Sequence, residues 1–393
     1  MIASIATAVV VFYALSSLAL ALLFAVHLRI PEDRLSARVA LVLPVTGPLP
    51  GLEDLLAALT AQSLRPCRLI IAVESREDPA YDRIAVLADR YLALNIELVV
   101  AGLSELRSQK CTNLLAALAR LHRDDAHLVL LDADIRPQPW WLSALVGPLA
   151  AGRADIVNGY RWPVPRTLSL GIALAAGIDR AIAVLPRLRQ TRTIWGGSLA
   201  LTRHALEILD LPNTIGRTLT EDLPIGDRAA ATGLKVLTRR AVRAPTPLDD
   251  SLRDLWRFGR RQYQLIRLYR RGLWCFAALV VTTDLVARLV LLSSLGASGP
   301  ALPVILVLAC LGSITTEIRL AIGKKLSAPD RIGFRLSQHL LAWAVLPSPA
   351  FHASVIWSGF FTSRVPWGHV HYIVDSTGQV IKVVRQSHSD QSI

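Results

Sequence analysis

The chain has 393 residues, of which 52% are hydrophobic, and its formal net charge at pH 7 is +13. This length is enough for about two domains. No aromatic–basic motif or dense Lys/Arg run occurs, so we expect no nucleic-acid partner. The positive charge fits a preference for Arg combined with contacts to anionic lipid headgroups and a diphosphate.

The 4 cysteines are scattered and include no CxxC pair, so neither a zinc site nor a disulfide framework is indicated. A reducing, cytosol-facing body is therefore the default. Apolar residues concentrate towards the two ends of the chain, which predicts membrane segments on either side of a soluble body.

The first segment, 2–28, contains no charged side chain and is long enough to cross about 30 Å of hydrocarbon as a helix. A signal peptide is the weaker alternative, because no cation precedes the run and the run is too long. Arg29, Arg34 and Arg38 follow directly and favour a cytoplasmic position for the residues after this helix.

The next part alternates apolar strand patterns with helical spacing, which is typical of a mostly parallel α/β sheet with right-handed crossovers. The predicted strands lie at 38–44, 68–73, 96–100, from 129, at 155–160 and at 235–237. The predicted helices lie at 51–62, 82–92, 113–121 and 227–232. No G-x-G-x-x-G follows the first strand, so a dinucleotide cofactor is not supported.

The strand from Val129 runs directly into Asp132-Ala133-Asp134. Ligands of a parallel sheet lie beyond the carboxyl ends of its strands, so the two carboxylates arrive where a ligand would sit. Carboxylates are hard oxygen ligands that suit a divalent cation carrying a diphosphate. The alternative is a solvated loop after a core strand, because Asp-x-Asp is common by chance.

Two further stretches carry candidate site residues. Gly196 and Gly197 stand between Trp195 and a predicted strand, either for close approach to a ligand or as an ordinary turn. Glu221 and Asp222 precede the predicted helix 227–232, either as proton-accepting bases or as helix N-caps.

Residues 249–271 form a basic amphipathic pattern interleaved with Trp and Tyr. One interpretation is a surface helix lying against lipid headgroups. In the other, arginines and Gln264 close over a diphosphate, which matches guanidinium geometry. Both can hold together. The apolar segment 168–185 is either a buried amphipathic helix or a helix at the membrane interface.

The later apolar runs, 272–295 and 301–320, have spanning length, and the basic residues after the second predict an out-and-back pair with cytoplasmic ends. Asp284 and Arg288 are spaced to pair on one helix face, either as a structural pair or as a contact for the acceptor. The run 336–362 is broken at Pro347-Ser348-Pro349 and is either one kinked span or a re-entrant pair. Residues 369–384 have the pattern of a small β-hairpin.

Six motifs in this order resemble the inverting family 2-like glycosyltransferases, in particular the ceramide glucosyltransferase and hopanoid-associated branch. They are "LVLPVTGPLPGLEDLLAALTAQ", "REDPA", "SQKCTNLLAAL", "LDADIRPQPWWL", "WGGSLALTR" and "TEDLPIGDRAAATG". The resemblance covers about 38–271 and extends to the membrane layout. It implies a Rossmann-like (GT-A type), mostly parallel α/β sheet domain flanked by transmembrane helices.

The resemblance also implies roles for individual residues. Asp132 and Asp134 match the pair that binds the nucleotide-sugar diphosphate through Mg²⁺ or Mn²⁺, and Asp222 matches the general base. Lys110 and Asn113 match residues found near the nucleotide. The resemblance further implies that the sugar and acceptor pocket contains Trp195, Gly196, Gly197 and Glu221.

Two departures from the family pattern concern the donor. The family has an Asp contacting the nucleobase where this chain has Glu74-Ser75. The family also ends its soluble part with Gln/Arg-x-x-Arg-Trp. Here the match is either Gln264 to Arg267, without the Trp, or Arg257 to Arg260 and Arg261. Both placements remain open.

The expected organisation comprises five parts. They are a transmembrane helix at 1–28, a cytosolic catalytic domain at 38–248, a basic interfacial helix at 249–271, membrane segments at 272–363 and a hairpin tail at 364–393.

The expected function is inverting, metal-dependent sugar transfer from a nucleotide-sugar donor, UDP-glucose or UDP-N-acetylglucosamine, to a lipid hydroxyl such as ceramide or a hopanoid. The catalytic domain would face the cytoplasm at a bacterial inner membrane or its equivalent. No protein partner is deducible. The alternatives are a processive polysaccharide synthase and a catalytically degenerate membrane protein that binds lipid or nucleotide.

Overall fold

The computed structural model describes residues 1–31, 35–295, 301–360 and 362–385. They pack into two compact units, each described here by itself. The sheet unit comprises Arg29–Arg161, Arg187–Thr246 and the chain from Ser363. The helical unit comprises Met1–Leu28, Trp162–Pro186 and Pro247–Thr362.

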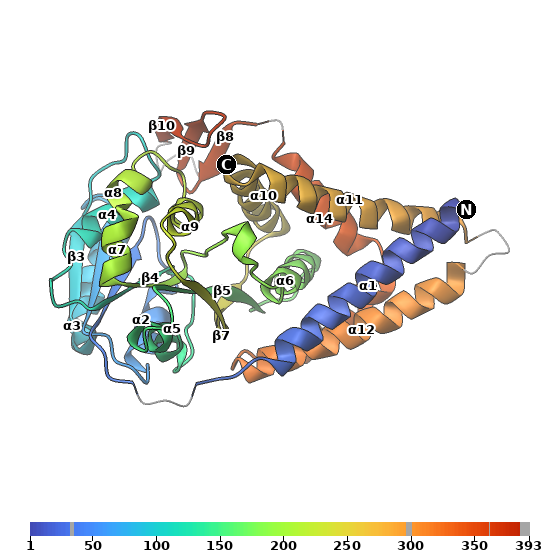
Figure 1. Cartoon of the computed structure of the whole chain (residues 1–393), viewed down its shortest axis with the longest axis horizontal. Helices are drawn as coiled ribbons and strands as arrows, with labels where there is room; N and C mark the ends of the chain where they lie inside the picture. The colour runs from blue at the N-terminus through green and yellow to red at the C-terminus, as the bar shows by residue number, and fades with distance from the viewer. Residues whose placement is uncertain (32–34, 296–300, 361, 386–393) are drawn as a thin grey trace. The chain divides into compact units, whose positions relative to one another are not determined.

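The sheet unit is built on a mixed sheet with strand order β3-β2-β1-β4-β6-β5-β7 (Figure 1). The strands are β1 (Val39–Pro44), β2 (Arg68–Val73), β3 (Ile96–Val100), β4 (His127–Leu131), β5 (Ile156–Pro165), β6 (Ser198–Thr202) and β7 (Val236–Leu248). β1 pairs in parallel with β2 and β4, and β2 with β3. β6 runs antiparallel to β4 and β5. The predicted mostly parallel α/β sheet is confirmed.

Helices cover both faces of this sheet because its central strands are apolar on both sides. Alternate β1 residues enter different cores: Leu41 and Leu43 belong to one cluster and Val42 to the other. The helices of this unit are α2 (Leu52–Thr60), α3 (Pro79–Arg90), α4 (Gln109–Leu118), α5 (Trp141–Ala150), α7 (Arg203–Leu209), α8 (Leu211–Thr214) and α9 (Asp222–Ala231). The carboxyl ends of the parallel strands therefore lie along one edge of the sheet.

Several predicted boundaries are correct and others are wrong. β2 and β3 begin and end as predicted. α4 begins earlier than predicted because Ser108 Oγ caps it, accepting a hydrogen bond from Cys111 N at 3.1 Å. α9 begins at Asp222 rather than at 227, so Asp222 lies in its first turn. The predicted strand 235–237 is the beginning of β7, which has 13 residues.

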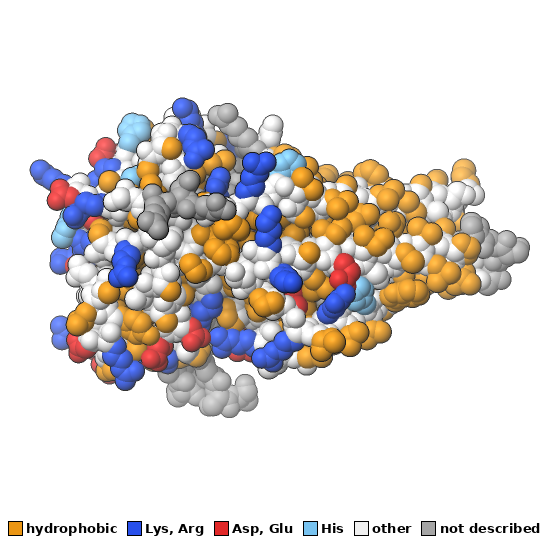
Figure 2. Space-filling model, turned by 90° about the horizontal axis from the view of Figure 1, so that it is seen from below, with side chains coloured by type: hydrophobic (Ala, Val, Ile, Leu, Met, Phe, Trp, Pro, Cys, Tyr) orange, Lys and Arg blue, Asp and Glu red, His pale blue; other side chains and the backbone are white. Residues whose placement is uncertain are grey.

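The helical unit contains, among the described residues, three helices long and apolar enough to cross a membrane: α1 (Ile2–Val26), α11 (Arg271–Ser293) and α12 (Ala301–Lys325). α13 (Ile332–Ala344) and α14 (Pro347–Ser358) form a pair bent by 86°, either one broken span or a re-entrant loop. Figure 2 shows hydrophobic side chains gathered along the long helices. The predicted membrane segments are therefore present as helices.

Charged pairs inside the helical unit support its packing. Arg288 Nε lies 2.9 Å from Asp284 Oδ1, which is the predicted pair on one helix face. Arg288 also donates to the carbonyl of Val345 at the break between α13 and α14. Arg180, on α6 (Leu170–Ala183), pairs with Asp330 at 2.7 Å, and both side chains are buried. α6 is thus a buried helix of this unit.

A second, antiparallel sheet closes the described chain, with order β10-β9-β8. Its strands are β8 (Arg364–Trp367), β9 (Val370–Val374) and β10 (Val380–Arg385). The predicted hairpin is β9 and β10, and β8 extends it. This C-terminal sheet packs within the sheet unit, and Trp162–Pro186 packs within the helical unit. The predicted ranges instead put residues 162–186 in the catalytic domain at 38–248 and made 364–393 a separate tail. The domain ranges remain a prediction.

Candidate active site at the carboxyl edge of the sheet

Lys110 joins two predicted acidic motifs at the carboxyl edge of the sheet. Its Nζ lies 2.7 Å from Asp132 Oδ1, directly after β4, and 2.7 Å from Glu221 Oε1, directly before α9. Although burial opposes it, the two carboxylates raise the pKa of Lys110 well above its usual value. The structure therefore brings together three residues that lie far apart in the sequence.

The Gly196–Gly197 turn allows the carboxylates to approach this closely. A Cβ added at Gly196 would lie 1.9 Å from Glu221 Oε1, and one at Gly197 would lie 2.4 Å from Asp132 Oδ2. A side chain at either position would therefore force these carboxylates to shift. The chain's own acidic side chains thus lie close to this turn. Its approach to a ligand remains a prediction. Trp195 packs beside the same turn, 2.3 Å from the added Cβ of Gly197.

Glu221 is almost fully buried, with an exposed fraction of 1%. It stands at the N-cap position of α9, yet its side chain makes no capping hydrogen bond to the described residues. The N-cap interpretation is therefore wrong for Glu221. Its second oxygen, Oε2, is buried and has no hydrogen-bond partner in the described part of the chain. Such an atom is costly unless a ligand or water meets it.

Asp222 is held at one oxygen only. Its Oδ1 accepts hydrogen bonds from Thr220 Oγ1 at 2.6 Å and Leu223 N at 2.7 Å. Both of these hydrogen bonds end on the same oxygen. Burial and the negative charge of Glu221 raise the pKa of Asp222 to about 6. A carboxylate fixed in this way can accept a proton near neutral pH.

Asp134 lies two residues beyond Asp132, and although the residue is exposed overall, its carboxyl is crowded by neighbouring protein atoms. Removal of its carboxyl from bulk water and the charge of Asp132 raise its pKa to about 6. The described residues contain no group of three or more His, Cys, Asp or Glu side chains able to hold a metal ion. Two carboxylates still fit Mg²⁺ or Mn²⁺, because such ions complete their ligands with substrate phosphates and water.

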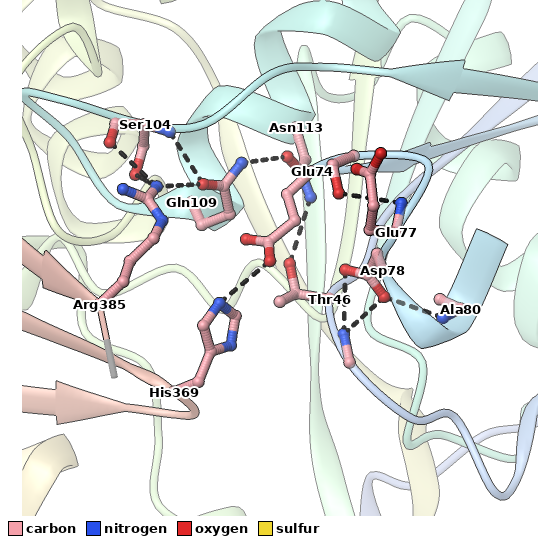
Figure 3. Close-up of polar contacts among 12 residues, drawn as sticks. Thr46, Glu74, Glu77, Asp78, Ala80, Ser104, Gln109, Asn113, His369 and Arg385 are labelled. Carbon is pink, nitrogen blue, oxygen red and sulfur yellow. Dashed lines mark hydrogen bonds and ion pairs between the residues drawn. The ribbon is translucent and has the colours of Figure 1, made fainter. Parts of the chain in front are cut away.

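The predicted nucleotide residues lie around the ends of β1 and β2. Asn113 is fully buried, and its Nδ2 donates to the carbonyl of Val45 at 2.6 Å and to Thr46 Oγ1 at 3.4 Å. Glu74 directly follows β2, and its Oε1 lies 3.0 Å from Nε2 of His369 in the C-terminal sheet (Figure 3). Asn113 therefore fixes the backbone that leaves β1.

The four remaining predicted donor residues lie on α10 (Leu252–Tyr269) in the helical unit. Gln264 is buried, and Arg267 donates to the carbonyl of Thr362 at 2.9 Å. Arg260 and Arg261 lie over aromatic rings of their own helix. Their contact with a diphosphate, and the choice between the two motif placements, remain predictions.

Sequence reasoning missed His369 and Arg385, which reach the sheet edge from the last strands of the described chain. Both lie in or beside the predicted hairpin, but a hairpin pattern does not indicate what its side chains contact. It also missed Gln109, whose Nε2 donates to Asn113 Oδ1 at 2.8 Å. The available signal was an amide four residues before Asn113, which a helix beginning earlier than the predicted 113 would place on the same face.

Acidic side chains gather at the ligand edge of an α/β sheet, in a chain with three described helices of membrane-spanning length, and the family comparison identifies the class as the glycosyltransferases. The family comparison specifies this further: residues 3–380 match the model of glycosyl transferase family 21. The chain belongs to this family. The resemblance predicted from the six motifs is confirmed at that level.

The solved structures that match this chain are distant in sequence. Mannosyltransferase PcManGT from Pyrobaculum calidifontis, in complex with GDP-Man and Mn²⁺, is 16% identical with a TM-score of 0.45, covering 91% of this chain and 99% of that one. Glucosyl-3-phosphoglycerate synthase from Mycobacterium tuberculosis is 17% identical with a TM-score of 0.37, covering 59% and 79%. No curated protein matches the chain.

Proposed function

We propose that this protein transfers a sugar from a nucleotide-sugar donor to the hydroxyl of a membrane lipid, with inversion at the sugar carbon. The donor is UDP-glucose or UDP-N-acetylglucosamine, and the acceptor is a ceramide, a hopanoid or a similar lipid alcohol. The observation that supports this most strongly is the Lys110 bridge. It brings the Asp132 strand end and the Glu221–Asp222 helix start to one place.

On the donor side, Asp132 and Asp134 would hold Mg²⁺ or Mn²⁺. Such an ion supplies charge stabilisation to the diphosphate as it leaves the sugar. Lys110 adds a positive charge beside Asp132, held by two short ion pairs. An ammonium fixed in place before the reaction stabilises developing negative charge without reorganisation. This part of the site binds and activates the leaving group.

On the acceptor side, Asp222 would act as the general base. A lipid hydroxyl is a poor nucleophile at neutral pH, and a positioned carboxylate that takes its proton contributes typically about 10²–10⁴-fold. Thr220 and Leu223 hold Oδ1, which leaves Oδ2 for the hydroxyl proton. When a single base acts on the side of the sugar opposite the diphosphate, the acceptor oxygen displaces the diphosphate in one step. The configuration at the sugar carbon is therefore inverted.

The membrane helices support a lipid rather than a soluble acceptor. Three helices of the described chain, or four with the bent pair, have spanning length and composition. A catalytic unit tethered in this way meets acceptors that are confined to the bilayer. The arginines after α1 support a cytoplasmic catalytic unit, since positive charge concentrates on that side.

The test is incubation of the purified full chain with a panel of nucleotide sugars and extracted membrane lipids, read by mass spectrometry. A singly glycosylated lipid is the expected product. A polymer would instead identify a processive polysaccharide synthase. If no nucleotide sugar gives heat in calorimetry with Mn²⁺ while lipid binds tightly, the protein is a non-enzymatic lipid-binding member of the family.

A further inference from the structure

Glu74 is a buried carboxylate with a partner at only one oxygen. Its exposed fraction is 6%, and it lies directly after β2, beside the end of β1. Its Oε1 pairs with His369, whereas its Oε2 has no hydrogen-bond partner among the described residues. Burial raises the pKa of Glu74, and His369 opposes that change. The side chain is thus placed at the ligand edge at an energetic cost that the fold does not fully offset.

His369 is presented by a tight turn of the C-terminal sheet. β8 ends at Trp367 and β9 begins at Val370, with Gly368 at φ +60° between them. A positive φ favours glycine, so the sequence of the turn sets the direction of His369. His369 itself is 7% exposed, so it is enclosed together with Glu74. The contact is therefore a defined part of the fold.

The C-terminal sheet is fixed to the catalytic core at further points. Tyr372 Oη accepts a hydrogen bond from Gln109 N at 2.9 Å. Arg385 donates to the Ser104 carbonyl at 3.0 Å and to Gln109 Oε1 at 2.9 Å (Figure 3). The backbone of Val380 also donates to the carbonyl of Arg217 at 2.8 Å. These contacts hold the sheet in one register against the residues that start α4.

The same contacts continue to the backbone that follows β1. Gln109 holds Asn113, and Asn113 holds the carbonyl of Val45. Two residues further, Gly47 has φ +75° and open space where a side chain would begin. Asp78 fixes this glycine by accepting from its N–H at 3.0 Å. The C-terminal sheet therefore supports both sides of one corner, namely Glu74 after β2 and the Val45–Gly47 backbone after β1.

We propose that the C-terminal sheet is a working part of the donor site, in which His369 positions Glu74 and so shapes the subsite for the nucleobase. This proposal rests on the proposed function. The corner presents hydrogen-bond acceptors, of which the Glu74 carboxylate is the main one. Such acceptors suit a nucleobase whose edge carries an imide or amide N–H. Uracil and guanine have such an edge. His369 is a positioning residue here, because it acts through Glu74.

The test is calorimetric titration of the 393-residue chain in detergent with Mn²⁺, using UDP, GDP and inorganic pyrophosphate as separate probes. His369→Ala is expected to weaken binding of the nucleotide that the wild type prefers by about 10-fold. Binding of pyrophosphate should stay within about 2-fold, because that ligand has no base. His369→Gln should recover most of the nucleotide affinity, since its amide can still donate to Glu74.

The matched control is His371→Ala, two residues further on in β9 with a half-buried side chain, which should bind all three probes as the wild type does. Unchanged UDP and GDP affinities in His369→Ala would overturn the proposal and leave the proposed function standing. Equal weakening of nucleotide and pyrophosphate, without recovery in His369→Gln, would also overturn it, because that result indicates general unfolding. A wild type that binds none of the three probes would refute the proposed function as well.

Discussion

The Lys110 ammonium lies 2.7 Å from the carboxylate of Glu221, whose side chain is only 2% exposed. A buried ion pair is a poor source of stability by itself, because both charges lose water. Its effect here is geometric, since it fixes the start of α9 and with it the neighbouring Asp222. The candidate base is therefore held in place by a residue of α4.

Replacement of Lys110 by Met should remove sugar transfer and destabilise the fold. Removing one partner of a buried pair leaves an uncompensated charge, which costs about 3–5 kcal/mol when both groups are fully buried. Lys110 is 20% exposed, so we expect less, about 2 kcal/mol of unfolding free energy. The measurement is denaturant unfolding together with product formation. The double variant Lys110→Met/Glu221→Gln should regain stability but not activity, and regained activity would contradict the role given to Lys110.

Asp222→Asn should lower kcat by about 10²–10⁴-fold, since the amide cannot accept the hydroxyl proton. Affinity for UDP with Mn²⁺ should remain within about 2-fold, because the change adds no bulk and lies on the acceptor side. Single-turnover kinetics and calorimetry separate the two effects. The control is Asp227→Asn on the same helix, a half-exposed carboxylate. Full transfer by a folded Asp222→Asn variant would refute the assignment.

The pH dependence of kcat/KM should follow the ionisation of Asp222. Its pKa is raised to about 6, and the protonated carboxyl cannot act as a base. The rate should therefore be low at acid pH, rise as the pH passes through about 6 and then level off. The profile is measured from pH 5 to 8 with a saturating metal ion. If kcat/KM instead falls only near the ordinary pKa of an Asp side chain, the burial around Asp222 does not control the reaction.

Gly196→Ala should disrupt the site, because its Cβ would lie 1.9 Å from Glu221 Oε1. Crowding of this kind costs about 1–3 kcal/mol and would displace Glu221 and its ion pair. Activity should fall while the secondary structure, read by circular dichroism, is kept. Gly147→Ala is the control. Outside its own helix, a Cβ there meets no atom of the described residues within 4 Å. A fully active Gly196→Ala variant would show that the close approach is not required.

Removal of divalent metal with EDTA should abolish binding of UDP, and added Mn²⁺ should restore it. Asp134→Asn should require at least about 10-fold more Mn²⁺ for the same binding, because one oxygen ligand loses its charge. The readout is calorimetry at several metal concentrations. Equal UDP affinity with and without metal would contradict the placement of the ion at Asp132 and Asp134.

Local patterns identified the strands that carry the site. β2 and β3 were correct to the residue, because apolar runs of five or six residues fix both period and length. The prediction for α9 was wrong at its start. Pro224 and Gly226 weaken a helical pattern, and the contacts around Glu221 and Asp222 override this weak propensity. The extension of β7 was missed for a similar reason, since its arginines and prolines do not read as a strand.

By itself the sequence determined the alternating strand–helix order, the strand end at Asp132 and the apolar segments long enough to cross a bilayer. Each of these depends on residues close together in the chain. Tertiary structure alone decided that Lys110 joins Asp132 to Glu221, that two glycines make room for those carboxylates and that His369 reaches Glu74. Such contacts depend on which elements pack together, and side-chain spacing along the chain carries no information about partners so far apart.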